Sequence, residues 1–360
     1  MLQLKEINLV QFRNYANHHQ VFNQQIVAIC GLNGTGKTNL LDAIYYLGFS
    51  RSYFARTDAQ NVQHGKQGMR LSGNFIKEGK DAEVTFILRE NNKKELLVNA
   101  ESYKKISDHI GKFPCVMIAP DDVELIAGPS EERRKLIDSI LSQTNRDYLI
   151  HLIAYNKIIQ QRNSLLKQMA EQPQMSNDLL EVYNEQLILK GTFLHHQRKQ
   201  FLSIFLPMVG ENYTSIAGKN EDLQLSYESQ LLSTSFKEIL AENLAKDKVL
   251  QRTSRGVHRD DMGIYLNNCP FKSEASQGQR KSLLFAIKLA EWEYLKMTIG
   301  VPPILLLDDV FEKLDENRMA HLLDQVCSNH FGQVFITDTH ADRIKEKLEQ
   351  TGSPYQLILL

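Results

Sequence analysis

The chain has 360 residues, of which 42% are hydrophobic and 24% charged, as is typical of a soluble globular protein with a sizeable core. Its formal net charge of −1 excludes a whole-chain attraction to nucleic acid or to an anionic membrane, so any DNA binding requires a local basic patch. Apolar runs such as residues 304–307 are far too short to span a bilayer, and the N-terminus lacks a signal-peptide pattern. The four cysteines lie far apart, which favours free thiols in a reducing compartment. We therefore expect a cytoplasmic protein without membrane partners.

In chain order, the first distinctive segment is a glycine-rich loop. Alternating apolar residues at 2–9 and an extended piece near 21–22 come before it, and the apolar run at 26–30 predicts a buried strand. Apolar residues at helical spacing follow in 39–47. Strand, loop and helix are the context in which the pattern G-x-x-x-x-G-K-[ST] binds phosphate. The loop consists of Gly31, Leu32, Asn33, Gly34, Thr35, Gly36, Lys37 and Thr38.

Each part of this loop has a chemical role in nucleotide binding. The glycines allow backbone N–H groups to turn around the β-phosphate, and the N-terminus of the next helix adds positive potential. The Lys37 ammonium can reach the β- and γ-phosphate oxygens, and the Thr38 hydroxyl can bind Mg²⁺. The loop therefore predicts ATP and Mg²⁺ as cofactors.

The next segments predict a second sheet. A basic, aromatic loop at residues 51–56 is followed by period-two segments at 69–75, 82–88 and 95–98, which turn-like residues separate. We expect them to form an antiparallel meander beside the main sheet. Residues 113–118 predict another buried strand.

The hydrophobic period becomes helical after residue 120. Apolar residues recur at three- and four-residue steps, and Pro173 and Pro207 are expected to interrupt the helices. No heptad pattern is sustained over four repeats, so we expect a compact lobe and not a long coiled-coil arm. The predicted fold is an α/β P-loop head of ABC type, with a mixed sheet and the meander, built from residues 1–120 and 251–360. A mostly α-helical lobe, residues 121–250, is inserted into it.

Two later segments complete the pattern of an ABC-type ATPase. Residues 304–307 predict a strand that ends in Asp308 and Asp309, as in a Walker B motif. Asp308 would bind Mg²⁺ or its water shell, and Asp309 would be the catalytic carboxylate that orients the attacking water, acting together with Lys37. Residues 276–279 resemble the signature motif of ABC-type ATPases at the start of a helix. The signature residues expected to contact nucleotide are Ser276, Gln277 and Gly278.

The order and spacing of these motifs narrow the class of protein. A subunit cannot easily bring its signature motif to its own loop, so heads of this class pair head to tail, and we expect an ATP-dependent homodimer with Leu314 and Asp315 in a dimer-facing loop. Gly31 and Ser276 are 245 residues apart, much more than in transporter ATPase subunits, whereas Ser276 and Asp308 are only 32 apart. A transporter subunit and a nuclease-linked ATPase remain alternatives. The long insertion argues against the first, and the second would need an acidic metal cluster for which the chain has no room.

Beyond these general motifs, the chain resembles the RecF family of bacterial recombination mediators from end to end. The specific features are Arg-Arg-x-x-x-Asp at residues 133–138 and Gly-x-His-Arg-Asp-Asp at residues 256–261, which are not general features of ABC-type ATPases. The resemblance also includes residues 12–15, and it implies that Arg13 and Asn14 border the nucleotide.

The resemblance implies a function in recombinational repair, DNA replication and the SOS response. A protein of this type dimerises on ATP and acts as a clamp that binds double-stranded DNA next to single-stranded gaps, without reading sequence. It works with RecR and RecO to load RecA, and slow ATP hydrolysis acts as a release timer. Asp309, which stands where a glutamate is usual, fits weak hydrolysis. For the switch residue after the last strand, Asp338 and His340 are both candidates.

Several basic segments are candidates for DNA contacts. The loops at residues 51–56 and 252–255 could clamp phosphates in a sequence-independent way. Arg133, Arg134 and Lys135 could do the same, or could form ion pairs with the neighbouring acids Glu131, Glu132 and Asp138.

Overall fold

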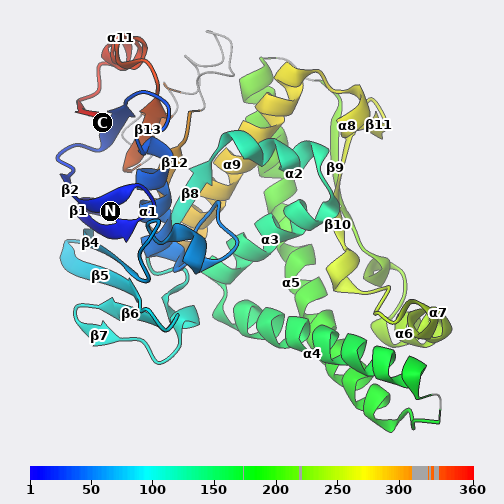
Figure 1. Ribbon diagram of the computed structural model, residues 1–360. Coiled ribbons are helices and arrows are strands. Elements are labelled where there is room, and N and C mark those ends of the chain that lie inside the picture. The colour runs from blue at the N-terminus through cyan, green and yellow to red at the C-terminus, as the bar shows by residue number, and fades with distance from the viewer. Residues whose placement is uncertain (173, 219–220, 310–322, 324–325, 328–331) are drawn as a thin grey trace. The chain divides into compact units, whose positions relative to one another are not determined.

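The computed structural model describes all residues except 173, 219–220, 310–322, 324–325 and 328–331. The chain divides into two compact units (Figure 1). Unit 1 comprises Met1–Asp122, Asn212–Gly218 and Gln277–Leu360, and unit 2 comprises Val123–Glu211 and Lys219–Ser276.

The centre of unit 1 is a five-stranded parallel sheet in the order β14-β3-β13-β12-β8. All but β14 are buried along their whole length, because apolar runs of this kind suit a sheet covered on both faces. The strands are β3 (Ile26–Cys30), β8 (Cys115–Ile118), β12 (Ile304–Leu307), β13 (Val334–Asp338) and β14 (Tyr355–Leu359). The helices α1 (Lys37–Phe49), α9 (Gln277–Ile299) and α11 (Ala341–Thr351) each pack against one or more of them.

The second sheet of unit 1 is the predicted antiparallel meander, which the structure confirms and extends. The strand order is β2-β1-β4-β5-β6-β7. The helix α1 packs against strands of both sheets, so that one hydrophobic core joins them. The strands are β1 (Leu2–Phe12), β2 (Tyr15–Val21), β4 (Met69–Lys77), β5 (Lys80–Leu88), β6 (Lys94–Val98) and β7 (Glu101–Ser102); short 3₁₀ turns are η1 (Asp58–Asn61), η2 (Ile106–His109) and η3 (Pro120–Val123).

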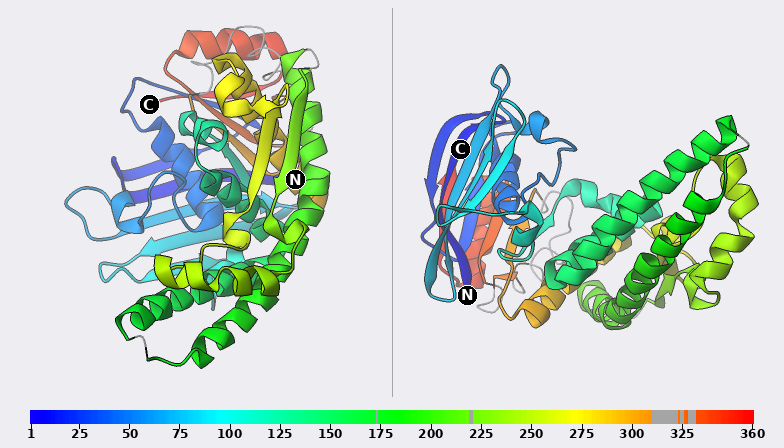
Figure 2. Two further views of the ribbon diagram at one scale, coloured as in Figure 1. Left: turned by 90° about the vertical axis from the view of Figure 1, so that its right-hand side faces the viewer. Right: turned by 90° about the horizontal axis from the view of Figure 1, so that it is seen from below.

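Unit 2 is mainly helical and contains one small three-stranded sheet in the order β11-β10-β9. Its long helices α4 and α5 run side by side (Figure 2), joined by a buried cluster of leucines. Its helices are α2 (Glu124–Ala127), α3 (Ser130–Thr144), α4 (Arg146–Glu171), α5 (Asp178–Ala217, whose end from Asn212 belongs to unit 1), α6 (Phe236–Glu242), α7 (Leu244–Leu250) and α8 (Phe271–Glu274). Its strands and 3₁₀ turns are β9 (Leu223–Glu228), β10 (Asp261–Leu266), β11 (Cys269–Pro270), η4 (Gln230–Leu232) and η5 (Val257–Arg259).

The helix α5 corrects one prediction, because it continues through Pro207 instead of ending there. A proline inside a helix leaves one backbone carbonyl without its usual amide partner. Phe205 and Val209 flank the proline and are fully buried. We infer that their burial offsets the cost of the missing bond. Pro173, the other predicted break, lies outside the described residues.

The compact units differ from the predicted boundaries at residues 251–276, which we expected in the head and which belong to unit 2. The reason is long-range strand pairing: β10 lies antiparallel to β9, with Asp261 opposite Glu228 and Leu266 opposite Leu223. The local hydrophobic pattern carries no information about this pairing.

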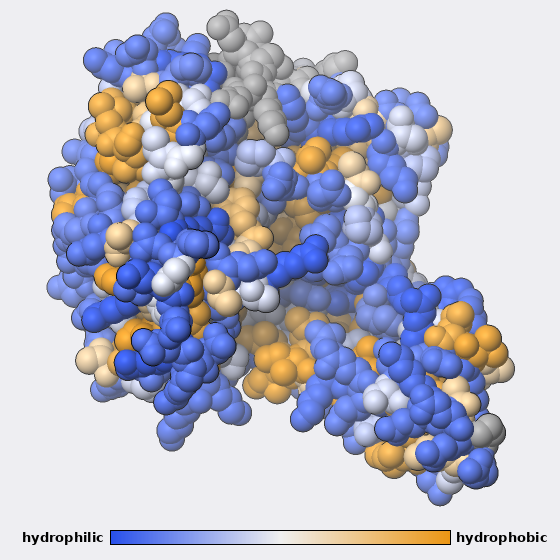
Figure 3. All heavy atoms as spheres, in the orientation of Figure 1, coloured by the Kyte–Doolittle hydropathy of each residue, from blue (hydrophilic) through white to orange (hydrophobic). Residues whose placement is uncertain are grey.

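The described part of the chain includes no helix that is both long and apolar enough to cross a membrane. Hydrophilic residues cover most of the face drawn in Figure 3.

Candidate nucleotide-binding site

The glycine-rich loop connects β3 to α1 at the carboxyl end of the parallel sheet, where ligands of open α/β sheets bind. Lys37 is only 4% exposed, and its Nζ donates hydrogen bonds to the carbonyl oxygens of Gly31 at 2.8 Å and Leu32 at 3.3 Å. Among the described residues, no carboxylate lies within ion-pair distance of Lys37. The ammonium charge is therefore available to an anion held by the loop.

The loop also contacts the end of β12. The Thr38 hydroxyl donates to Oδ1 of Asp308 at 3.0 Å, and the Thr337 hydroxyl donates to the same oxygen at 2.9 Å. Burial raises the pKa of Asp308 to about 6, although both hydroxyl donors oppose the shift. The backbone N–H of Asp309 donates to the Thr337 hydroxyl at 2.8 Å. A hydroxyl beside a carboxylate offers the hard oxygen ligands that Mg²⁺ prefers, so the residues present fit a magnesium site.

The turn between β1 and β2 lies against the same loop. The Asn14 amide donates to the carbonyl oxygen of Thr35 at 3.0 Å, and the Tyr15 hydroxyl donates to that of Gly36 at 3.1 Å. Gly36 has φ +116°, in the region that favours glycine, and a Cβ there would lie 2.6 Å from Asn14 Nδ2. The antiparallel sheet therefore helps to hold the glycine-rich loop in its conformation.

Arg13 lies at the other side of this turn and binds α1. Its guanidinium donates to Asn39 at 2.9 Å and to Asp42 at 2.6 Å, and it also contacts Asn61 and Ser52. Burial raises the pKa of Asp42, and the adjacent guanidinium opposes that shift. Arg13 thus anchors the first turns of α1, directly behind the loop.

The predicted signature residues stand at the boundary of the two units. Ser276 is the last residue of unit 2, and Gln277 and Gly278 begin α9 in unit 1. Ser276 and Gln277 are exposed, and Gly278 is half-buried. Among the described residues, no hydrogen bond joins Gln277 or Gly278 to residues 31–38. The predicted dimer-facing Leu314 and Asp315 lie outside the described residues.

The two candidate switch residues have different surroundings. Asp338 is 1% exposed, and its carboxylate oxygens accept from Arg343 Nη2 at 2.7 and 2.8 Å. The backbone N–H of His340 also donates to Asp338, at 2.7 Å, whereas the His340 side chain is exposed. Asp338 therefore holds the turn after β13, whereas the His340 side chain is accessible to solvent.

Sequence reasoning missed three residues that support the site, namely Thr337, Asp42 and Tyr15. Thr337 contacts Asp308 because β13 lies next to β12 in the sheet. A polar residue at the end of an apolar strand was visible in the sequence, but the order of the strands was not. Asp42 carried a signal of its own, because a carboxylate on the apolar face of a helix requires a buried partner.

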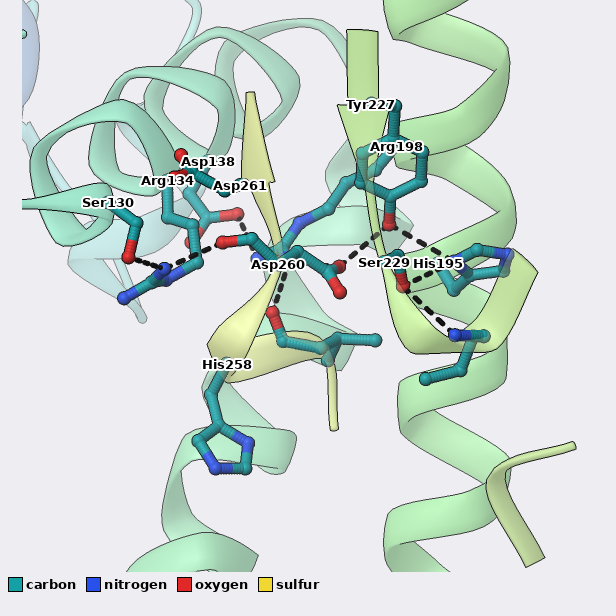
Figure 4. Close-up of polar contacts among 12 residues, drawn as sticks. Ser130, Arg134, Asp138, His195, Arg198, Tyr227, Ser229, His258, Asp260 and Asp261 are labelled. Carbon is teal, nitrogen blue, oxygen red and sulfur yellow. Dashed lines mark hydrogen bonds and ion pairs between the residues drawn. The ribbon is translucent and has the colours of Figure 1, made fainter. Parts of the chain in front are cut away.

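The two segments most specific to the resemblance contact each other inside unit 2 (Figure 4). Arg134 donates to the Ser130 hydroxyl at 2.7 Å and to the backbone carbonyl of Asp260 at 2.6 Å. Arg198 of α5, which the sequence did not single out, is 2% exposed and pairs with Asp138 at 2.8 Å and Asp260 at 3.0 Å. Both motifs therefore contribute to one buried ionic network.

The neighbouring cations are also paired within unit 2. Arg133 binds Asp261 through two hydrogen bonds of 2.7 and 2.9 Å. Lys135 is exposed and pairs with Glu132 at 2.8 Å and Glu131 at 3.0 Å. Of the two alternatives for this segment, the structure favours ion pairs over phosphate contacts.

Comparisons with known proteins agree with this arrangement. The chain matches the family described as RecF/RecN/SMC N terminal domain over residues 3–355. It is 42% identical over 359 residues to the DNA replication and repair protein RecF of Flavobacterium johnsoniae, with both chains covered completely. It is 38% identical to the RecF protein of Bacteroides fragilis, covering 98% of this chain and 95% of that one.

Solved structures are similar too. The structure of the recombination mediator protein RecF-ATPrS in RecFOR pathway is 30% identical, with a TM-score of 0.87 over 94% of this chain and 93% of that chain. The Smc head domain from Pyrococcus furiosus, 13% identical with a TM-score of 0.56 over 98% of this chain and 92% of that chain, shares the fold alone. The predicted α/β head of the ABC/SMC type is therefore confirmed. The chain belongs to the RecF family of DNA replication and repair proteins.

Proposed function

We propose that this chain is an ATP-dependent DNA clamp that dimerises on ATP and binds double-stranded DNA next to single-stranded gaps. In this proposal it acts with RecR and RecO to help load RecA in recombinational repair, replication and the SOS response. The single observation that carries the nucleotide part is the contact between the Thr38 hydroxyl and Asp308, 3.0 Å apart, beside the buried Lys37. Related RecF structures described with ATP and ATPrS support it.

In this site the loop 31–38 holds the triphosphate, and Lys37 neutralises the β- and γ-phosphate charge. Thr38 and Asp308 would hold Mg²⁺, which when bound would neutralise the negative charge of the phosphate oxygens of ATP. Asp309 is the carboxylate proposed to orient the attacking water. Its φ of 44° lies in the left-handed region, which a residue with a side chain adopts at a cost and which is found most often at functional sites. A carboxylate one methylene shorter than the usual glutamate reaches less far, which supports weak hydrolysis.

The other half of the site is proposed to come from a second copy of the chain. Ser276 is exposed and directly precedes α9, so its hydroxyl and the first N–H groups of this 23-residue helix are suited to a γ-phosphate. Gln277 and Gly278 complete that surface. In the proposed dimer, ATP on residues 31–38 of one subunit is covered by this segment of its partner.

Lys37→Met tests the nucleotide part. The substitution removes the positive charge and keeps an apolar stem of similar length, so ATP affinity should fall by tenfold or more and ATP-induced dimerisation should disappear. Analytical ultracentrifugation with and without ATP measures this. Lys345→Met, an exposed substitution on α11, is the control and should dimerise normally. A Lys37→Met variant that still dimerises with ATP would contradict the proposal.

Ser276→Arg tests the shared site. The variant should bind ATP as a monomer with unchanged affinity, because residues 31–38 are intact, and should fail to dimerise. Ser273→Arg on α8, also exposed, provides the matched control. The affinity for gapped duplex DNA, measured with and without ATP, then tests whether dimerisation is coupled to DNA binding. Equal DNA affinity with and without ATP would contradict the proposal of an ATP-dependent DNA clamp.

A further inference from the structure

An open pocket with a volume of about 380 Å³ lies where α7 ends and the chain turns toward η5. In Figure 1, α7 lies beside α6 and near the end of α4, and each of them contacts it. All the lining residues belong to unit 2. Four of the six are cationic: the pocket is lined by Lys246, Leu250, Arg252, Ser254, Arg255 and Arg259.

The positive charge of this pocket is not cancelled by its own segment. Asp247 is the sole acidic residue in 243–259, and it is paired at 2.8 Å with Arg162, which is fully buried. The next acid along the chain, Asp260, is buried and paired with Arg198 at 3.0 Å. Buried arginines therefore neutralise both carboxylates from inside.

The four cations themselves have no acidic partner among the residues that the structure describes. Within the described part of the chain, the side chains of Lys246, Arg252, Arg255 and Arg259 make no ion pair and no hydrogen bond. Lys246, Arg252 and Arg259 are exposed, and Arg255 is half-buried. Like charges that cluster without counter-ions repel one another and destabilise a fold slightly. The four cations therefore do not stabilise the fold, and a bound ligand would account for their arrangement.

The loop between α7 and η5, which carries Arg252 and Arg255, is held in place before any ligand arrives. Ser254 donates through its backbone N–H at 2.8 Å and its hydroxyl at 2.6 Å to Asp247. Thr253 donates in the same two ways to Asn163 of α4, at 2.7 and 2.8 Å. The two residues lie between Arg252 and Arg255, so a ligand bound by the arginines does not have to order the backbone.

The chemistry of the lining selects the ligand. Three guanidinium groups and one ammonium offer many donors to phosphate oxygens, and guanidinium groups suit phosphate particularly well. Leu250 is the one apolar side chain among the lining residues, which gives little anchorage to a protein tail. We propose that this pocket binds the phosphate backbone of nucleic acid, as a DNA contact in unit 2 that is separate from the nucleotide site in unit 1. This inference rests on the proposed DNA-binding function.

The test is the double variant Arg252→Gln/Arg259→Gln, with DNA affinity measured for a gapped duplex over a range of salt concentrations. Each phosphate contact contributes about 0.9 to the slope of log affinity against log salt. We expect the slope to become shallower by about 1 to 2 and the affinity near 0.1 M salt to fall by tens of fold. The matched control is Lys167→Gln/Lys237→Gln, which removes two exposed charges of unit 2 that do not line the pocket. It should leave the slope nearly unchanged.

A charge-preserving variant separates binding from folding. Arg252→Lys/Arg259→Lys should restore the salt slope, and ATP binding by every variant should equal that of the original protein, because the substitutions lie in unit 2. If the glutamine variant binds DNA with the original slope, the pocket proposal is overturned and the proposed function stands. If the original protein binds no DNA in any nucleotide state, both fail. The binding of a poly-glutamate peptide is measured beside that of DNA. If the glutamine variant binds DNA normally but no longer binds the peptide, the pocket is a protein-docking site and the proposal is also overturned.

Discussion

At the scale of single residues, the conformation of the glycine-rich loop depends on the absence of a side chain at Gly36. Its φ is +116°, and a Cβ on this residue would lie 2.6 Å from Asn14 Nδ2 and 2.7 Å from Tyr15 Oη, which leaves no room for a side chain. Two hydrogen bonds from the β1–β2 turn cross the same gap. The glycine is therefore required both by backbone conformation and by packing.

Gly36→Ala should displace this turn from the loop, weaken ATP binding by tenfold or more, and lower the free energy of unfolding by about 1–3 kcal/mol. Gly34→Ala is the matched control, because Gly34 also has a positive φ, +87°, but a Cβ there meets nothing within 4 Å. Titration with a fluorescent ATP analogue and urea denaturation measure the two effects. Equal losses in both variants would show that backbone conformation alone matters.

At the scale of elements, α9 carries a buried charge cluster. Lys288 is 4% exposed and lies 3.7 Å from Asp122 and 3.4 Å from Glu291, and its Nζ donates to the Tyr53 hydroxyl at 3.2 Å. Burial lowers the pKa of Lys288, but the two carboxylates outweigh it and the net shift is upward. The cluster connects α9 to η3, the turn after β8, and to the loop after α1.

Lys288→Met should lower the free energy of unfolding by about 3–5 kcal/mol, because two carboxylates are left buried without a cation. Adding Glu291→Leu should recover part of this loss, since it removes one of the unpaired charges. Urea denaturation of the single and double variants measures the coupling. If the losses of unfolding free energy in the two single variants simply add up in the double variant, the cluster is contradicted. The control is Lys345→Met on the surface of α11, which should change stability by less than about 0.5 kcal/mol.

At the scale of the whole molecule, stability should depend on the buried His109 in unit 1 and the half-buried His258 in unit 2. Burial lowers the pKa of His109 in unit 1 and of His258 in unit 2 to about 4 each. In the unfolded chain these side chains titrate near 6.5, so between pH 6.5 and 4 the unfolded state binds protons that the folded state refuses. Their contribution to stability is complete above pH 6.5 and is lost as the pH falls toward 4.

His109 by itself accounts for about 3 kcal/mol of this loss, because each unit of pKa shift corresponds to about 1.4 kcal/mol. His109→Gln should be less stable at pH 7.5 but should show a flatter decline of stability between pH 6.5 and 4. The control is His64→Gln, because His64 is exposed. Parallel pH profiles for the His109 variant and the original protein would contradict the prediction.

The sequence by itself determined the parts of this protein that depend on local patterns. The strand, glycine-rich loop and helix around Lys37 and Thr38, and the strand that ends before Asp308, were predicted because each depends on the residues of one short segment. The meander followed from period-two segments in the same way, and the RecF family followed from motifs spread along the whole chain.

Only the tertiary structure decided which distant residues meet. Thr337 contacts Asp308, Arg13 contacts Asp42, and the buried Arg198 pairs with two separate motifs. Strand order and helix packing bring these pairs together, and both arise from the burial of apolar surface over the whole chain. A short segment of sequence carries no information about that burial. The continuation of α5 through Pro207 has the same cause, since long-range packing there outweighs a strong local preference.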